Sequence, residues 1–154
     1  MLRDPQYVDK VAPNEPSFQD LPRNRFFSTE EEVLASRPRT DGEGHPADVQ
    51  WNVLDRPTSV QLLQFVHLDG NAGWAGEEDT ELGHRLRAFR HVRNRPSTEV
   101  HGADAPFLGA RQLWWPTVSA FEEGVRAAPG ALAELVDRAG HAITMLAVSE
   151  RFLR

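Results

Sequence analysis

The sequence predicts an α+β domain in which helices cover one face of an antiparallel sheet. Stretches with the composition of strands alternate with stretches of helical periodicity along residues 58–154. Their order, which is strand, helix, strand, strand, helix pair and strand, is that of the ferredoxin-like βαββαβ unit. Residues 1–57 are instead polar and rich in proline. We therefore expect a ferredoxin-fold domain at 58–154 that follows an extended N-terminal segment at 1–57.

The first half of the domain contains two predicted strands and one helix. The stretch TSVQLLQFVHL at 58–68 is apolar and β-branched and has no breaker, which is typical of a buried strand. A helix is predicted at 77–88, because its first turn is acidic and Leu82 and Leu86 share one face. The stretch FRHVRNRP at 89–96 alternates in polarity and ends at proline, which predicts the second strand.

The second half begins with a predicted loop at 97–107. The apolar stretch LGARQLWWP at 108–116 predicts a third strand. A helix is expected at 117–127, begun by a capping Thr or Ser, and a Pro-Gly breaker separates it from a second short helix at 131–138. The stretch HAITMLAVSERFL at 141–153 predicts the last strand.

The predicted strands are apolar on both faces. In HAITMLAV, for example, alternate residues on each side are mostly apolar. Helices can cover only one face of the sheet, and the usual cover for a second apolar face is another sheet. We therefore expect a homodimer that associates through its sheet faces.

Composition excludes several classes of function. The net charge of −6 argues against nucleic acid and against an anionic membrane as partners, since both bind basic surfaces. The chain has no cysteine, which excludes disulfides and thiolate chemistry. It contains no long apolar run and no signal-peptide pattern, so we expect a cytoplasmic protein.

Three stretches resemble the EthD-like family of the dimeric α+β barrel superfamily: LRAFRHVRNRP at 86–96, ARQLWWPTVSAFEEGVRAA at 110–128 and HAITMLAVSERFL at 141–153. The resemblance covers roughly residues 58–154. It implies a dimeric barrel and a cofactor-independent enzyme that acts on a small aromatic or polyketide-like compound, as an isomerase, lyase, cyclase or oxygenase. Residues 7–34 resemble the end of such a unit, so they are either the remnant tail of a first repeat or a generic extension with one edge strand.

The sequence departs from the family pattern in the first helix of the domain. Many members carry a His followed by Pro and Leu there, whereas this chain has Glu78, Asp79 and Thr80 at the matching position. His84 lies in the same predicted helix, about one turn later. The alternative function is therefore a non-catalytic ligand-binding or accessory subunit that pairs with an active EthD-like homologue.

Histidines and one carboxylate are the candidates for proton transfer. His67 ends the first strand, where strand ends line the pocket of a barrel, and His84 lies on the first helix. His91 shares a strand face with Arg93, which would hold an anionic group of the substrate. Asp79 would act as a base or orient a histidine. For each of these side chains the alternative is a structural role.

The tryptophans are the candidates for binding an aromatic ligand. Trp114 and Trp115 are adjacent on a predicted strand, so they point to opposite faces, and one of them would stack on the substrate. Trp74, in a glycine-rich loop, would cover the pocket. Core packing is the alternative. No HExxH or His-x-His spacing occurs and 117–138 contains no histidine for heme, so we expect neither a metal nor a cofactor.

Overall fold

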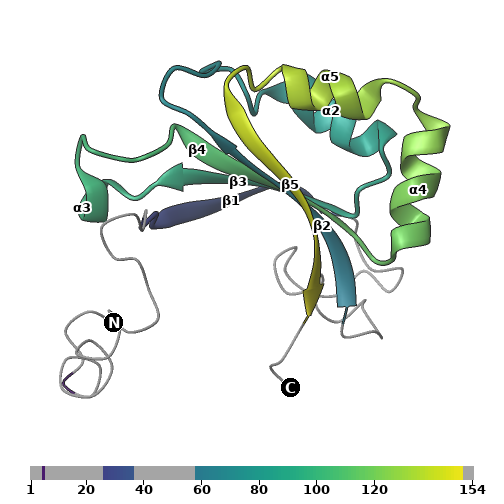
Figure 1. Ribbon diagram of the computed structural model, residues 1–154, viewed down its shortest axis with the longest axis horizontal. Helices are drawn as coiled ribbons and strands as arrows, with labels where there is room; N and C mark the ends of the chain where they lie inside the picture. The colour runs from purple at the N-terminus through teal and green to yellow at the C-terminus, as the bar shows by residue number, and fades with distance from the viewer. Residues whose placement is uncertain (1–4, 6–25, 37–57, 151–154) are drawn as a thin grey trace.

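The computed structural model describes residues 5, 26–36 and 58–150. These residues form an α+β structure with one five-stranded antiparallel sheet and several helices (Figure 1), which confirms the predicted α+β class. Most of the N-terminal segment predicted at 1–57, and the end of the last predicted strand at 151–153, lie outside the described residues.

The sheet contains the four predicted strands and one strand from the N-terminal segment. Its order is β1-β3-β4-β2-β5, and every neighbouring pair is antiparallel. The strands across the sheet are β1 (Thr29–Ser36), β3 (Arg90–Pro96), β4 (Gly109–Trp115), β2 (Thr58–Val66) and β5 (Ala142–Glu150). β1 carries the acidic run EEE and occupies the edge beside β3, where its carboxylates meet arginines.

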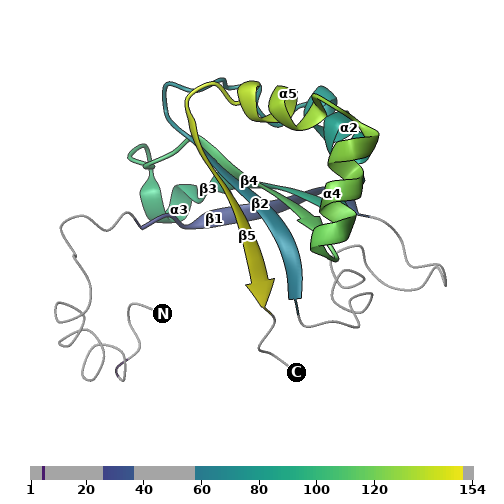
Figure 2. The same cartoon turned by 45° about the vertical axis from the view of Figure 1, so that its right-hand side comes forward.

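Three helices cover one face of the sheet: α2 (Glu77–Arg85), α4 (Val118–Ala127) and α5 (Ala131–Asp137) (Figures 1 and 2). They match the three predicted helices to within a few residues at each end. The Oγ1 atom of Thr117 accepts a hydrogen bond from the Ala120 amide at 3.1 Å. Thr117 is therefore the N-cap of α4, in agreement with the predicted capping Thr or Ser.

The predicted loop at 97–107 contains a short helix, α3 (Thr98–His101), which the sequence did not predict. It lies away from the other helices, beside the start of β1 (Figures 1 and 2). The His101 ring nitrogen Nε2 accepts a hydrogen bond from the Ser28 amide at 2.8 Å. A four-residue helix has too little periodicity to show in a sequence, and this one is held by a contact with a distant segment.

The main core lies between the sheet and the three helices. Val60 and Leu62 on β2 pair with Trp115 and Leu113 on β4, and all four side chains are buried toward the helices. The cluster consists of Val60, Leu62, Leu82, Leu86, Ala88, Leu113, Trp115, Ala128, Ala131 and Leu135. This burial explains the helical spacing of Leu82 and Leu86, because both side chains face the sheet.

The edge strand β5 leaves apolar side chains exposed on both of its faces. Ile143, Met145, Leu146 and Val148 are between 44% and 64% exposed. Ile143 and Met145 pair with Phe65 and Leu63 on the face away from the helices. In the described part of the chain, no helix is both long and apolar enough to cross a bilayer.

Candidate functional site

His91, the leading candidate from the sequence, lies in the core beneath α2. A Cβ atom placed on Gly83 of α2 would be 2.9 Å from His91 Nδ1, so the imidazole packs directly against the helix backbone. Neither ring nitrogen has a hydrogen-bond partner among the described residues. Burial, with a contribution from the positive charge of Arg111, lowers the pKa of His91 to about 3. The ring is therefore neutral and closed off from a ligand.

Asp79 is the buried counter-ion of two arginines. Its Oδ2 atom lies 3.0 Å from Arg111 Nη1, and its Oδ1 atom is paired with Arg138 Nε. Arg111 also donates to Gln64 Oε1 at 3.0 Å and to the Leu135 carbonyl at 2.8 Å. Burial lowers the pKa of Arg111 to about 10, which leaves it charged at neutral pH. These contacts join the sheet to α2 and α5, so they support the fold rather than a reaction.

The tryptophans also serve mainly as core. Trp115 lies beneath the helices and donates from Nε1 to the Leu86 carbonyl at 2.8 Å. Trp74 is buried with its ring centroid 6.0 Å from the guanidinium carbon of Arg111. Trp114 is the next residue along β4 and points to the face opposite the helices, where it is 9% exposed.

Two of the three remaining candidates, Arg93 and His84, share no described site with the third, His67. Arg93 donates to the Glu32 carboxylate and, at 2.9 Å, to the Ala75 carbonyl, so its guanidinium is engaged within the fold. His84 is exposed on α2. The third, His67, is half-buried and lies in a cluster of histidine and carboxylate side chains.

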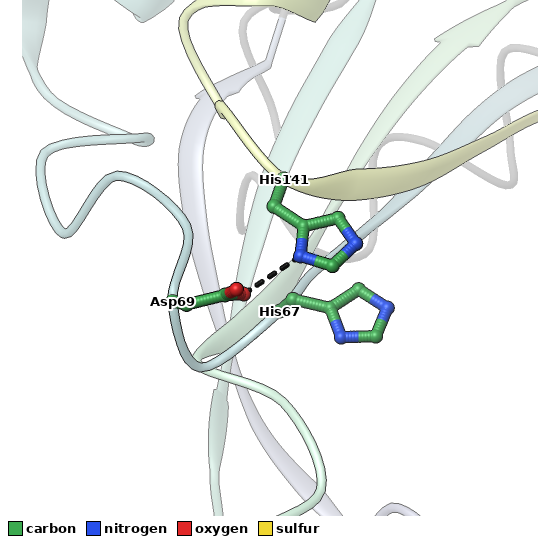
Figure 3. Close-up of side chains that lie close together, drawn as sticks. All are labelled: His67, Asp69 and His141. Carbon is green, nitrogen blue, oxygen red and sulfur yellow. Dashed lines mark hydrogen bonds and ion pairs between the residues drawn. The ribbon is translucent and has the colours of Figure 1, made fainter.

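The structure brings His67 together with two residues that the sequence did not select, Asp69 and His141 (Figure 3). His67 follows β2, Asp69 lies in the turn after it, and His141 immediately precedes β5. The Asp69 carboxylate points at His141, with Oδ1 2.7 Å from Nδ1 (Figure 3). The two imidazole rings are stacked, with centroids 4.1 Å apart and planes inclined by 5°.

Backbone hydrogen bonds hold the two loops of this cluster together. The His67 amide donates to the His141 carbonyl at 2.9 Å, and the Asn71 amide donates to the Ala139 carbonyl at 3.0 Å. The turn is closed by the Gly70 amide, which donates to the His67 carbonyl at 2.9 Å. A Cβ atom on Gly70 would lie 2.9 Å from the His141 carbonyl oxygen, so the loops approach too closely for any other residue.

The hydrogen bond between Asp69 and His141 defines the state of both groups. Donation from His141, helped by its charge when it is protonated, lowers the pKa of Asp69 below the usual 3.8. Asp69 is therefore a carboxylate at neutral pH, and the proton in the hydrogen bond belongs to His141 Nδ1. In neutral His141 the lone pair is then on Nε2, and the side chain is 60% exposed.

An aromatic cluster extends from His67 along the sheet. The His67 ring meets Phe107 edge-on at 5.5 Å between centroids, and Phe107 contacts Phe65 at 5.2 Å and Phe27 at 5.4 Å. Phe65 alternates along β2 with Gln64 and Val66, whose side chains are buried beneath the helices, so it points to the opposite face. The three phenylalanines, which we call the aromatic cluster, are half-buried. A flat ligand could stack beside them.

Sequence reasoning missed Asp69 and His141 because they are 72 residues apart and form no local motif. His141 looked like a structural residue at a strand start. One signal could have found the pair. In a βαββαβ unit the first and last strands are antiparallel neighbours, so the end of the first strand lies beside the start of the last. The stretch HLDG then falls next to His141.

Comparison with known proteins gives no match: no protein-family model, no curated protein and no solved structure resembles the chain closely enough to report.

Proposed function

We propose that the protein is a cofactor-independent enzyme that moves a proton on a small aromatic or polyketide-like compound. The observation that carries the proposal is the exposed His141–Asp69 hydrogen bond, which lies beside His67 and the aromatic cluster. His141 is the base, Asp69 orients it, and the aromatic side chains hold the ring of the substrate.

The geometry of the dyad suits proton removal. Asp69 fixes the tautomer of His141, so that Nε2 presents a lone pair to solvent and to a ligand. When Nε2 accepts a proton, the imidazole becomes a cation, and the adjacent carboxylate stabilises that charge. A carbon acid next to a carbonyl group, or a phenol, would supply the proton. Removal of that proton could begin an isomerisation, an elimination or a cyclisation.

The fold of this enzyme is, in our proposal, the ferredoxin-like unit of the EthD-like family. Support comes from the strand order, since the four strands of the domain lie as β3-β4-β2-β5 with β1 added beyond β3. In this order the first and third strands of the βαββαβ unit are central and antiparallel. Support also comes from the three sequence stretches that resemble the family.

The alternative function is a ligand-binding or accessory subunit without catalytic activity. One observation favours it: His91, Asp79, Trp74 and Trp115 are all packed into the core, which leaves few polar side chains for chemistry. A binding subunit would use the same aromatic cluster, but His141 would only donate or accept a hydrogen bond. The two functions therefore differ in whether a proton is exchanged with the ligand.

Isotope exchange tests the proposed function without knowledge of the full reaction. Small aromatic ketones with a C–H next to the carbonyl are incubated with the protein in D₂O containing a chelator, and loss of the C–H signal is followed by NMR. We expect catalysed exchange in the wild type, lowered about 100-fold or more in His141→Ala. Asp69→Asn should also slow exchange, because an amide does not fix the reactive tautomer.

The matched control is His84→Ala, which removes an exposed imidazole from α2 and should leave the exchange rate unchanged. Equal exchange in the wild type and in His141→Ala would refute the proposed base. Binding of the ketones with no exchange above the buffer rate would favour the accessory function.

A further inference from the structure

We propose that His67, Asp69 and His141 also form a binding site for one divalent transition-metal ion. Each residue offers one ligand atom, and these atoms all lie within 4.8 Å of one another. Two imidazoles and one carboxylate are a donor set that holds a metal while leaving coordination positions for water or a ligand. The inference is independent of the proposed function, because it concerns binding alone.

The backbone around the three residues is already in place for an ion. The loop that follows β2 is joined to the loop before β5 by hydrogen bonds from the His67 and Asn71 amides. Asn71 adds a third contact, since its Nδ2 atom donates to the Arg138 carbonyl at 2.9 Å. None of these bonds uses a ligand atom of the site. Binding therefore requires side-chain rotation only, which lowers its entropic cost.

The donor set selects a class of ions. Imidazole nitrogens suit Zn²⁺, Cu²⁺, Ni²⁺ and Co²⁺, whereas Ca²⁺ and Mg²⁺ prefer sites made of oxygen atoms. The Asp69 carboxylate is 75% exposed and His141 is 60% exposed, so an ion reaches them directly from solvent. The stacked rings of His67 and His141 must turn so that one nitrogen of each faces the ion. His141 is exposed and free to turn, whereas His67 is half-buried and turns beside Phe107.

Metal binding and proton transfer compete for the same atoms. An ion held by His141 and Asp69 breaks the hydrogen bond between them and removes the orientation of the base. The loaded protein should therefore lose the isotope exchange that the metal-free protein catalyses. Binding itself is measured without any substrate, so failure of the proposed function leaves the metal site open to its own test.

Calorimetric titration of the full chain with Zn²⁺ tests the site. We expect saturable binding of one ion, weakened at least tenfold in His67→Ala, in His141→Ala and in Asp69→Asn, and unchanged in His84→Ala. Circular dichroism of each variant checks that it is folded. As a second measurement that needs no variant, Zn²⁺ should shift the imidazole NMR signals of His67 and His141 and leave that of His91 in place.

Any of three results would overturn the inference. The first is a wild-type protein that binds no Zn²⁺ at millimolar concentration. The second is binding that is equally strong in the folded His67→Ala and His141→Ala variants. The third is binding that shifts the NMR signals of other histidines only.

Discussion

At the scale of single residues, the buried charges decide stability. Asp79 and Arg111 are both fully buried, and Arg138 adds a second cation to the same carboxylate. A buried charge that loses its partner is costly, because neither water nor another group solvates it. The network therefore constrains how α2 and α5 dock on the sheet.

Asp79→Asn should lower the free energy of unfolding by about 3–5 kcal/mol, because Arg111 keeps its buried charge and loses its counter-ion. Urea unfolding followed by circular dichroism measures the change. Glu81→Gln, which alters an exposed acid on the same helix, is the control and should change the value by about 0.5 kcal/mol or less. An Asp79→Asn variant as stable as the wild type would show that the network is not needed.

His91 should make stability depend on pH in the acid range. Its pKa is about 3 in the folded protein, chiefly because of burial, against 6.5 when unfolded. Between these values the unfolded chain binds more protons, so stability falls as pH decreases from 6.5 towards 3, by at most about 1.4 kcal/mol per pH unit. His91→Leu should remove this part of the dependence of stability on pH. It should lower the free energy of unfolding little at pH 7, since the ring nitrogens have no hydrogen-bond partner among the described residues. Urea unfolding at pH 7 and pH 5 measures both; an unchanged slope would contradict the prediction.

The sequence identified several chemically capable residues but not their surroundings. Asp79 in the first turn of a helix is favoured by the helix dipole and needs no distant partner, so nothing local indicates Arg111. A histidine or a tryptophan on a strand is found both in pockets and in cores, so the residue types of His91 and Trp115 do not show which of the two they occupy. Their burial follows from the packing of α2 and α4 on the sheet, which residue spacing does not encode.

At the scale of elements, one close contact fixes α4 against the end of α2. Gly124 lies so near α2 that an added Cβ atom would be 2.0 Å from the Leu86 carbonyl oxygen. The same oxygen accepts the Trp115 hydrogen bond, which satisfies a carbonyl that the end of a helix leaves unpaired. The close packing of α4 against Leu86 thus explains why a glycine, Gly124, occupies the middle of the helix.

Gly124→Ala should destabilise the protein by about 1–3 kcal/mol, because the added methyl group forces α4 away from α2. Thermal unfolding measures this as a lower melting temperature. Gly73→Ala is the matched control: its Cβ atom would be 3.5 Å from the nearest side chain, an ordinary contact. Equal melting temperatures for the two variants would show that the helix contact is loose.

Element positions were largely predictable, because apolar alternation and helical spacing are local and strong in this chain. Four strands and three helices of the domain appear where the periodicity predicts them. The limits appear where local signal is weak. The helix α3, which has only four residues, is too short for a periodic pattern and was not predicted.

At the scale of the whole molecule, the exposed apolar residues of β5 support the expected self-association. Ile143 and Met145 extend the face that carries Phe65 and the aromatic cluster. Burial of such side chains against a second copy would remove apolar area from water, which favours association. The homodimer through the sheet faces is therefore our proposal for the assembly.

Sedimentation equilibrium tests the dimer. We expect the wild type to sediment as a dimer and Met145→Glu as a monomer, because a charge on the sheet face would be buried without a partner. Val118→Glu changes an exposed apolar residue on α4, on the helical side, and should remain dimeric. A wild type that is monomeric at all concentrations would contradict the proposal.

The central proposal is that the functional centre lies at His67, Asp69 and His141, at the ends of β2 and β5. The most direct test is to locate the binding site for aromatic ligands by NMR. The imidazole signals of the six histidines are assigned, and a set of small aromatic ketones and phenols is added. We predict that ligands which bind shift the signals of His67 and His141 and leave that of His91 unchanged. Ligands that shift His91 while His67 and His141 stay in place would contradict the claim, since the functional centre would then lie beneath α2 rather than at the ends of β2 and β5.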